Sequence, residues 1–234
     1  MKLALHGLIL ATTLSATSFA HAADAPPSGV VNLMSSASAE VTKDWMSVTL
    51  SVTRDGPEAN AVQSGIKQAL DAALTEARKV AKPGQVEVQT GNFSMFPRYS
   101  KASTISGWQG SAELVIEGRD MLAISQLVGR INSMTVARVG YGLSREQREK
   151  SEADVAAQAI ARYRAKAADY ARQFGYTAYA IREVNVSTDQ PQIGNPAPMY
   201  RAKAMSASSD EALPVEAGKA LVTVNVNGAV QLTK

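Results

Sequence analysis

The chain contains no cysteine, and its two histidines, His6 and His21, both lie close to the N-terminus. The rest of the chain therefore has no imidazole and no thiol, which excludes Ser-His-Asp and Cys-His catalysis there. Disulfide bonds, histidine-ligated haem and the usual zinc or copper sites are excluded for the same reason. The sequence thus predicts no catalytic residues, no cofactor and no metal site, and we expect a protein that is not an enzyme.

The chain also lacks a strong excess of charge of either sign. Its 24 Lys and Arg residues against 21 Asp and Glu residues leave a net charge of +3, and the two signs alternate along the sequence. A nucleic-acid-binding surface is typically a basic stripe with interleaved aromatic residues, and no such stripe is present. The sequence therefore predicts no nucleic-acid partner.

Long hydrophobic runs are scarce, apart from one at the N-terminus. Lys2 is followed by a mostly apolar run over 3–19 and then by Ala20-His21-Ala22, the small-x-small pattern that signal peptidase recognises. As a membrane anchor the run is too short and too rich in Thr and Ser. We therefore predict a signal peptide over 1–22 that is cleaved after Ala22, and a periplasmic protein with no integral membrane span.

The rest of the chain shows alternating strand patterns and helical periodicity. Asp55-Gly56-Pro57-Glu58 predicts a helix start with Asp55 as its N-cap, and Ser144 with Gln147 predicts a capping box. For the long helix that follows Ser144, the periodicity predicts a core stripe of Ala156, Ile160, Tyr163, Ala167, Tyr170 and Phe174. The predicted strands are 30–40, 45–53, 86–99, 108–117, 136–143, 180–188 and 219–230, and the predicted helices lie between 58 and 82, 120 and 131, and 144 and 174.

From 45 to 143 the predicted order is strand-helix-strand, strand-helix-strand. This order is typical of a ferredoxin-like βαββαβ core. We expect an α+β fold in which this core is extended by the long helix and two further strands, with an antiparallel or mixed sheet and helices on one face. Residues 23–234 are predicted to be one domain, with a loop over 189–214 that is a lid, an assembly arm or simply mobile.

The stretch TGNFSMFPRYS, residues 90–100, changes its alternation partway along. Its apolar side chains occupy even positions before Gly91 and odd positions after it, so a β-bulge at Gly91-Asn92 is predicted. Pro97 has no N–H to donate, which places this end of the strand at a sheet edge or beyond its pairing. The sequence therefore predicts a long, bulged strand that pairs on one side at most.

Five side chains of this strand are candidate binding residues. An apolar edge strand can accept a strand from a partner, and an open edge is more readily covered by a second copy than by a foreign ligand. The alternative is ordinary core packing with a solvated Arg, since strands are rich in aromatic residues. The candidates are Phe93, Phe96, Pro97, Arg98 and Tyr99.

Several segments resemble the SIMPL-domain family of bacterial periplasmic proteins. These are VEVQTGNFSMFPRYS, GWQGSAELVIEGRD, AIARYRAKAADYARQFGY and PVEAGKALVTVNVNGAVQL. The most specific pattern is Q-T-x-x-F-x-x-x-P-x-Y, from Gln89 to Tyr99. The resemblance implies a non-enzymatic α+β protein, assembly into a large oligomer and a link with oxidative-stress tolerance. It supplies no catalytic residues.

Three hypotheses about function follow. The first is a secreted periplasmic protein that self-assembles into a large homo-oligomer and supports envelope or stress tolerance. The second is a monomeric binding module for an envelope peptide or lipid, with 189–214 as a lid. The third is a hydrolase using only carboxylates, Ser and Lys, but the S-x-x-K match at Ser64 to Lys67 lies within an ordinary amphipathic helix.

Overall fold

The computed structural model of this chain describes residues 29–189 and 216–234, which form seven strands and three helices. The predicted signal peptide and nearly all of the predicted loop over 189–214 lie outside the described residues. The elements are β1 (Val30–Thr42), β2 (Trp45–Gly56), α1 (Ala59–Arg78), β3 (Glu87–Tyr99), β4 (Ile105–Gly118), α2 (Met121–Arg130), β5 (Thr135–Gly142), α3 (Arg145–Gln173), β6 (Ala178–Asp189) and β7 (Lys219–Thr233).

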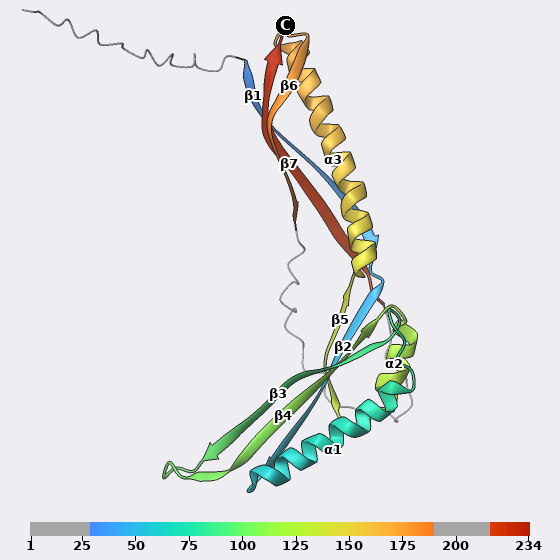
Figure 1. Cartoon of the computed structure of the whole chain (residues 1–234), viewed down its shortest axis with the longest axis vertical. Coiled ribbons are helices and arrows are strands. Elements are labelled where there is room, and N and C mark those ends of the chain that lie inside the picture. The colour runs from blue at the N-terminus through green and yellow to red at the C-terminus, as the bar shows by residue number, and fades with distance from the viewer. Residues whose placement is uncertain (1–28, 190–215) are drawn as a thin grey trace, which may run out of the picture.

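The described strands form two antiparallel sheets, whereas the sequence predicted one. The first has the order β1-β7-β6 and the second has the order β3-β4-β2-β5. The prediction of an α+β fold is confirmed, but the prediction of a single sheet is wrong because β1 pairs with β7 instead of joining β2. Figure 1 shows the first sheet with α3 at one end of the elongated molecule, and the second sheet with α1 and α2 at the other.

Each sheet has its own hydrophobic core. In the four-stranded half, alternate residues of β2 and β4 face α1 and α2, and each fully buried aliphatic side chain stabilises the fold by roughly 1.5–3 kcal/mol. In the three-stranded half, alternate residues of β1 and β7 face α3. The two cores contain Met46, Val48, Leu50, Leu114 and Ile116 in the first, and Leu33, Ala37, Val222, Val224 and Val226 in the second.

The starts of the helices test the predicted caps. Ser144 Oγ accepts a hydrogen bond from the backbone N–H of Gln147 (3.3 Å), which confirms Ser144 as the N-cap of α3. Asp55 is not the N-cap of α1, because β2 continues through Gly56 and the cap position is Glu58. Residue 55 still pairs with Gln109 across the sheet, so its backbone is extended and cannot begin a helix.

The predicted core stripe of α3 is only partly correct. Tyr163 and Ala167 are buried, but Ile160 and Phe174 are exposed. Alanine occupies so much of this helix that hydrophobic spacing does not choose a face. The sheet instead packs against a side with small residues, which lets the helix approach closely. The buried residues are Ser151, Val155, Ala159, Tyr163, Ala167 and Ala171.

Among residues 29–189 and 216–234, none of the three helices combines the length with the apolar character that a membrane-spanning helix needs.

Candidate functional site

The strand that carries the five candidate residues, β3, lies at the edge of the four-stranded sheet and pairs with β4 alone. Its pairing shifts by one residue between Thr90, opposite Leu114, and Phe93, opposite Ala112. This confirms the predicted bulge at Gly91-Asn92. The bulge also explains the glycine, since a Cβ on Gly91 would come within 2.9 Å of the Glu113 Cβ.

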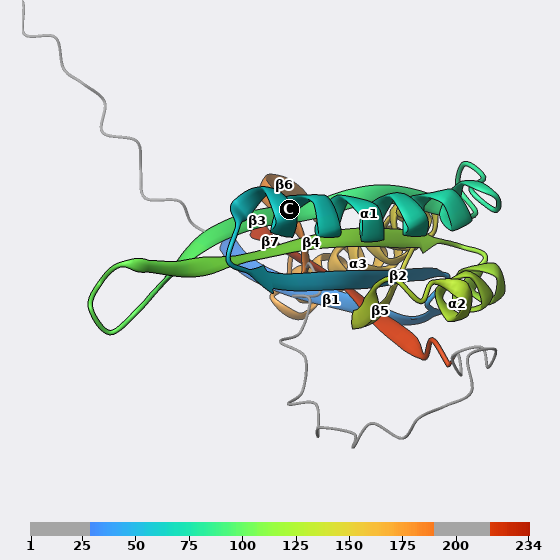
Figure 2. The same cartoon turned by 90° about the horizontal axis from the view of Figure 1, so that it is seen from below.

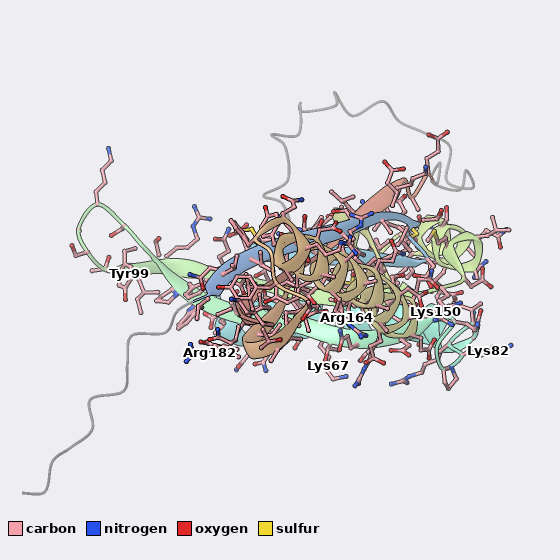
Figure 3. The ribbon with its side chains drawn as sticks, turned by 90° about the horizontal axis from the view of Figure 1, so that it is seen from above. Lys67, Lys82, Tyr99, Lys150, Arg164 and Arg182 are labelled. Carbon is pink, nitrogen blue, oxygen red and sulfur yellow. The ribbon has the colours of Figure 1, made fainter. Side chains whose placement is uncertain are left out.

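Beyond the bulge, β3 and β4 continue as a hairpin that projects from the sheet. The last β2 residue, Gly56, pairs with Trp108, so residues 98–107 lie beyond the pairing with β2; we name them the arm. Figure 2 shows the arm extending past the start of α1, and Figure 3 places Tyr99 on it, away from the body of the molecule. The predicted edge position of Pro97 is confirmed, since this residue faces Trp108 of β4 on one side and no strand of the described chain on the other.

The five candidate residues do not form one patch, because the pleat divides them between two faces. Phe93 lies opposite Ala112 and Pro97 opposite Trp108, on the side of the sheet that carries α1. Phe96 and Arg98 lie on the other side, where Arg98 reaches Asp55 of β2 (3.3 Å). The edge therefore has an exposed aromatic side chain on each of its faces, and the two do not converge on one pocket.

Three aromatic side chains of this strand are exposed to solvent. Phe93, Phe96 and Tyr99 are 51%, 62% and 63% exposed, so the core alternative does not describe them. Ile105 pairs with Tyr99 from β4 and is 54% exposed, which makes it a sixth member of the surface. The sequence prediction missed Ile105 because the predicted strands end at residue 99 and resume at residue 108, although Ile105 is the first apolar β-branched residue after the polar turn.

A second feature is a cleft where the two halves meet. It has a volume of about 690 Å³, and its lining combines charged side chains of both signs with the apolar side chains of Trp45 and Leu143. Arg145 donates a hydrogen bond to the Glu149 carboxylate (2.8 Å), and this bond raises the pKa of Arg145 above its ordinary value, so the guanidinium stays charged. The charged lining consists of Glu87, Arg119, Arg145, Glu146, Arg148, Glu149 and Glu152.

Behind the cleft, Asp44 ties the halves together. Its carboxylate accepts hydrogen bonds from the backbone N–H and the hydroxyl of Ser144, both at 2.6 Å. Arg119 donates to the same hydroxyl (2.7 Å), lies 3.5 Å from Asp44 and pairs with Glu146. No sequence motif signals this network, because residues 44 and 144 meet only through folding.

Carboxylates are common at the cleft, but they do not gather as metal ligands do. Within residues 29–189 and 216–234, no group of three or more His, Cys, Asp or Glu side chains is arranged to hold a metal ion.

The fold and this edge define a two-sheet α+β protein with an apolar, single-paired edge strand. A family model named SIMPL, described as a protein of unknown function (DUF541), matches residues 31–230. The chain therefore belongs to the SIMPL family, which confirms the resemblance seen in the sequence. The matched residues run through both sheets, from the start of β1 to near the end of β7. No curated protein matches the chain.

Proposed function

We propose that this protein is a non-enzymatic component of the bacterial periplasm that assembles with copies of itself through the β3 edge and the arm. One observation carries the assembly: four large apolar side chains, each more than half exposed, line an edge strand and the hairpin that extends it. An unpaired apolar edge is costly to leave in water, and a strand of another copy covers it with backbone hydrogen bonds.

The other parts of the proposal have different supports. The N-terminal run and Ala20-His21-Ala22 support secretion. The absence of Cys throughout, and of His after residue 21, supports a role other than catalysis. The role in envelope or oxidative-stress tolerance comes from the resemblance to the SIMPL family, and its test is survival of a strain lacking the gene under peroxide, complemented with wild type or an arm variant.

We also propose that the four-stranded half is ferredoxin-like. The strand order is β3-β4-β2-β5. Helix α1 connects β2 to β3, and β4 lies between these two strands; helix α2 connects β4 to β5, and β2 lies between those two.

The assembly is tested by measuring the mass of the secreted protein with light scattering after size exclusion. We expect a discrete oligomer for wild type and a smaller species for the double variant Phe96→Ser, Tyr99→Ser, because it removes exposed apolar surface without touching the core. Leu122→Ser is the matched control, since Leu122 is equally exposed but lies on α2. A monomeric wild type would refute self-assembly.

The junction cleft favours a second candidate, a monomeric binding module. Ligands often bind where two halves of a protein meet, and the lining of this cleft combines charged groups with apolar side chains. A monomeric wild type whose melting temperature rises with an envelope peptide or lipid would favour this function. Loss of that rise in Arg148→Ala would then place the ligand in the cleft.

A further inference from the structure

The two sheets have four edge strands between them, and these edges differ in how their backbones are covered. β1 and β6 flank the three-stranded sheet, and β3 and β5 flank the four-stranded sheet. An edge strand leaves a row of backbone N–H and C=O groups that can accept another strand unless something blocks it. The edges that remain open therefore decide where a second copy can add.

The β1 edge is blocked by α3. Arg162 donates to the carbonyl oxygen of Ser36 (2.8 Å), and Lys166 donates to that of Met34 (3.1 Å). Residues 34 and 36 are alternate positions of one strand, so their carbonyl groups point out from the same edge. Two cationic side chains therefore occupy the positions that an incoming strand would need.

The β5 edge is a poor acceptor for a different reason. It has only eight residues, and its pairing with β2 shifts between Arg138, opposite Thr49, and Val136, opposite Leu50. Short length, a bulge and a charged side chain are the usual protections of an edge strand. Two long edges are left, β3 with 13 residues and β6 with 12.

The β6 edge is apolar and uncapped. Three apolar side chains of β6 lie on the face of the sheet that α3 covers: Ile181, Val184 and Val186. Each is nevertheless 47–48% exposed, because α3 lies mainly over β1 and β7. Within the described ranges, no Arg or Lys of α3 bonds to the β6 backbone, in contrast to β1. In Figure 3, looking down the long axis, Arg182 of this strand lies at the border of the molecule.

The charges at the ends of β3 and β6 are complementary in one direction only. β3 begins at Glu87 and carries Arg98 near its end, while β6 ends at Asp189. Parallel alignment over the full length sets Arg98 beside Asp189, whereas antiparallel alignment sets Glu87 there and brings two carboxylates together.

We propose that the partner of β3 is β6 of a second copy, added in parallel, so that the two sheets continue into one another across the contact. The inference rests on the proposed self-assembly and names the surface that the second copy supplies. Each copy offers one β3 and one β6, so the contact is head to tail and repeats from copy to copy until it closes into a ring or extends as a filament.

A mixing experiment tests the pairing. Phe93→Lys blocks β3 and Val186→Lys blocks β6, and both positions are about half exposed, so the monomers can fold; circular dichroism checks this. Because every contact needs one open β3 and one open β6, each variant alone is expected to be a monomer. An equimolar mixture is expected to contain a species of two chains, since one variant supplies β6 and the other supplies β3.

Met34→Lys is the matched control. Met34 is an exposed apolar residue on an edge strand of the same sheet, but its edge is already capped, so wild-type mass is expected. An oligomeric wild type whose mass survives Val186→Lys, or a mixture that stays monomeric, would overturn the β6 partner and leave self-assembly standing. A monomeric wild type would overturn both.

Single cysteines test the direction, because the native chain has none to interfere. Under oxidising conditions, Phe96→Cys mixed with Ser187→Cys is expected to give a disulfide-linked dimer, and Phe96→Cys mixed with Ala180→Cys is not, while Arg98 and Asp189 are both kept. A link to position 180 instead of 187 would overturn parallel pairing.

Discussion

The network around Asp44 at the junction of the two halves gives the most quantitative prediction. The Asp44 carboxylate accepts two hydrogen bonds, both at 2.6 Å, from Ser144, and Ser144 is buried. A hydrogen bond to a charged group contributes about 1.5–3 kcal/mol, and a buried donor left unpaired adds to the loss. The Asp44 side chain is 33% exposed, so water recovers part of this in a variant. We expect Asp44→Ala to lower the free energy of unfolding by about 2–4 kcal/mol.

The assay is urea unfolding followed by tryptophan fluorescence, since Trp45 adjoins Asp44 and is one of only two tryptophans. Asp44→Asn keeps one acceptor oxygen and should cost about half as much as Asp44→Ala. A double-mutant cycle with Ser144→Ala should give a coupling energy of about 1 kcal/mol or more, because the two side chains bond directly. An Asp44→Ala variant within about 0.5 kcal/mol of wild type would refute the reasoning.

The remaining predictions concern the three-stranded half. Gly228→Ala should destabilise the protein by at least about 2 kcal/mol, because the new Cβ would clash with the Glu183 carbonyl oxygen of β6 at 2.1 Å. The control is Gly142→Ala, whose Cβ would meet open space and should change stability by less than about 0.5 kcal/mol. Equal urea midpoints for the two variants would contradict the predicted clash. Tyr163→Phe should leave the melting temperature unchanged or raise it, because the buried hydroxyl has no hydrogen-bond partner among the described residues, and a clear fall would point to one. Burial raises the pKa of Tyr163 above its ordinary 10.0, so the unfolded chain ionises first. The stability that the neutral Tyr163 hydroxyl contributes is complete below pH 10 and is lost as the pH rises through the folded-state pKa. Wild type should therefore lose stability above pH 10 more steeply than Tyr163→Phe, as urea midpoints measured at several pH values would show. Parallel curves for the two proteins would contradict the raised pKa.

Local patterns were enough to predict the form of β3. The change of parity at Gly91 predicted the bulge, and Pro97 predicted an edge, because both effects arise within one strand and its immediate partner. The same reasoning failed at Asp55, where a good capping sequence is overridden by pairing with β4. A cap is worth about 1 kcal/mol, which sheet pairing and side-chain burial readily exceed.

The arrangement of the five candidate residues could be predicted only in part. Their strand and its edge position followed from the sequence, and the structure adds their division between two faces, the exposed partner Ile105 and the projection of the arm beyond β2. The covering of β1 by Arg162 and Lys166 was not predictable, since it depends on where α3 lies on the sheet. The open β6 edge follows from the same placement.

The sequence by itself determined the element order and membership of the SIMPL family. The elements follow from periodicity, which is a local property set by the order of neighbouring residues, and the family follows from patterns of the same kind. Only the tertiary structure decided that the strands divide into two sheets. Residues 43 and 44 connect β1 to β2 whichever partner each strand takes, and the choice of β7 for β1 depends on burying both strands beneath α3. Contacts between positions so far apart in the chain are decided by the packing of the whole fold, which no local pattern encodes.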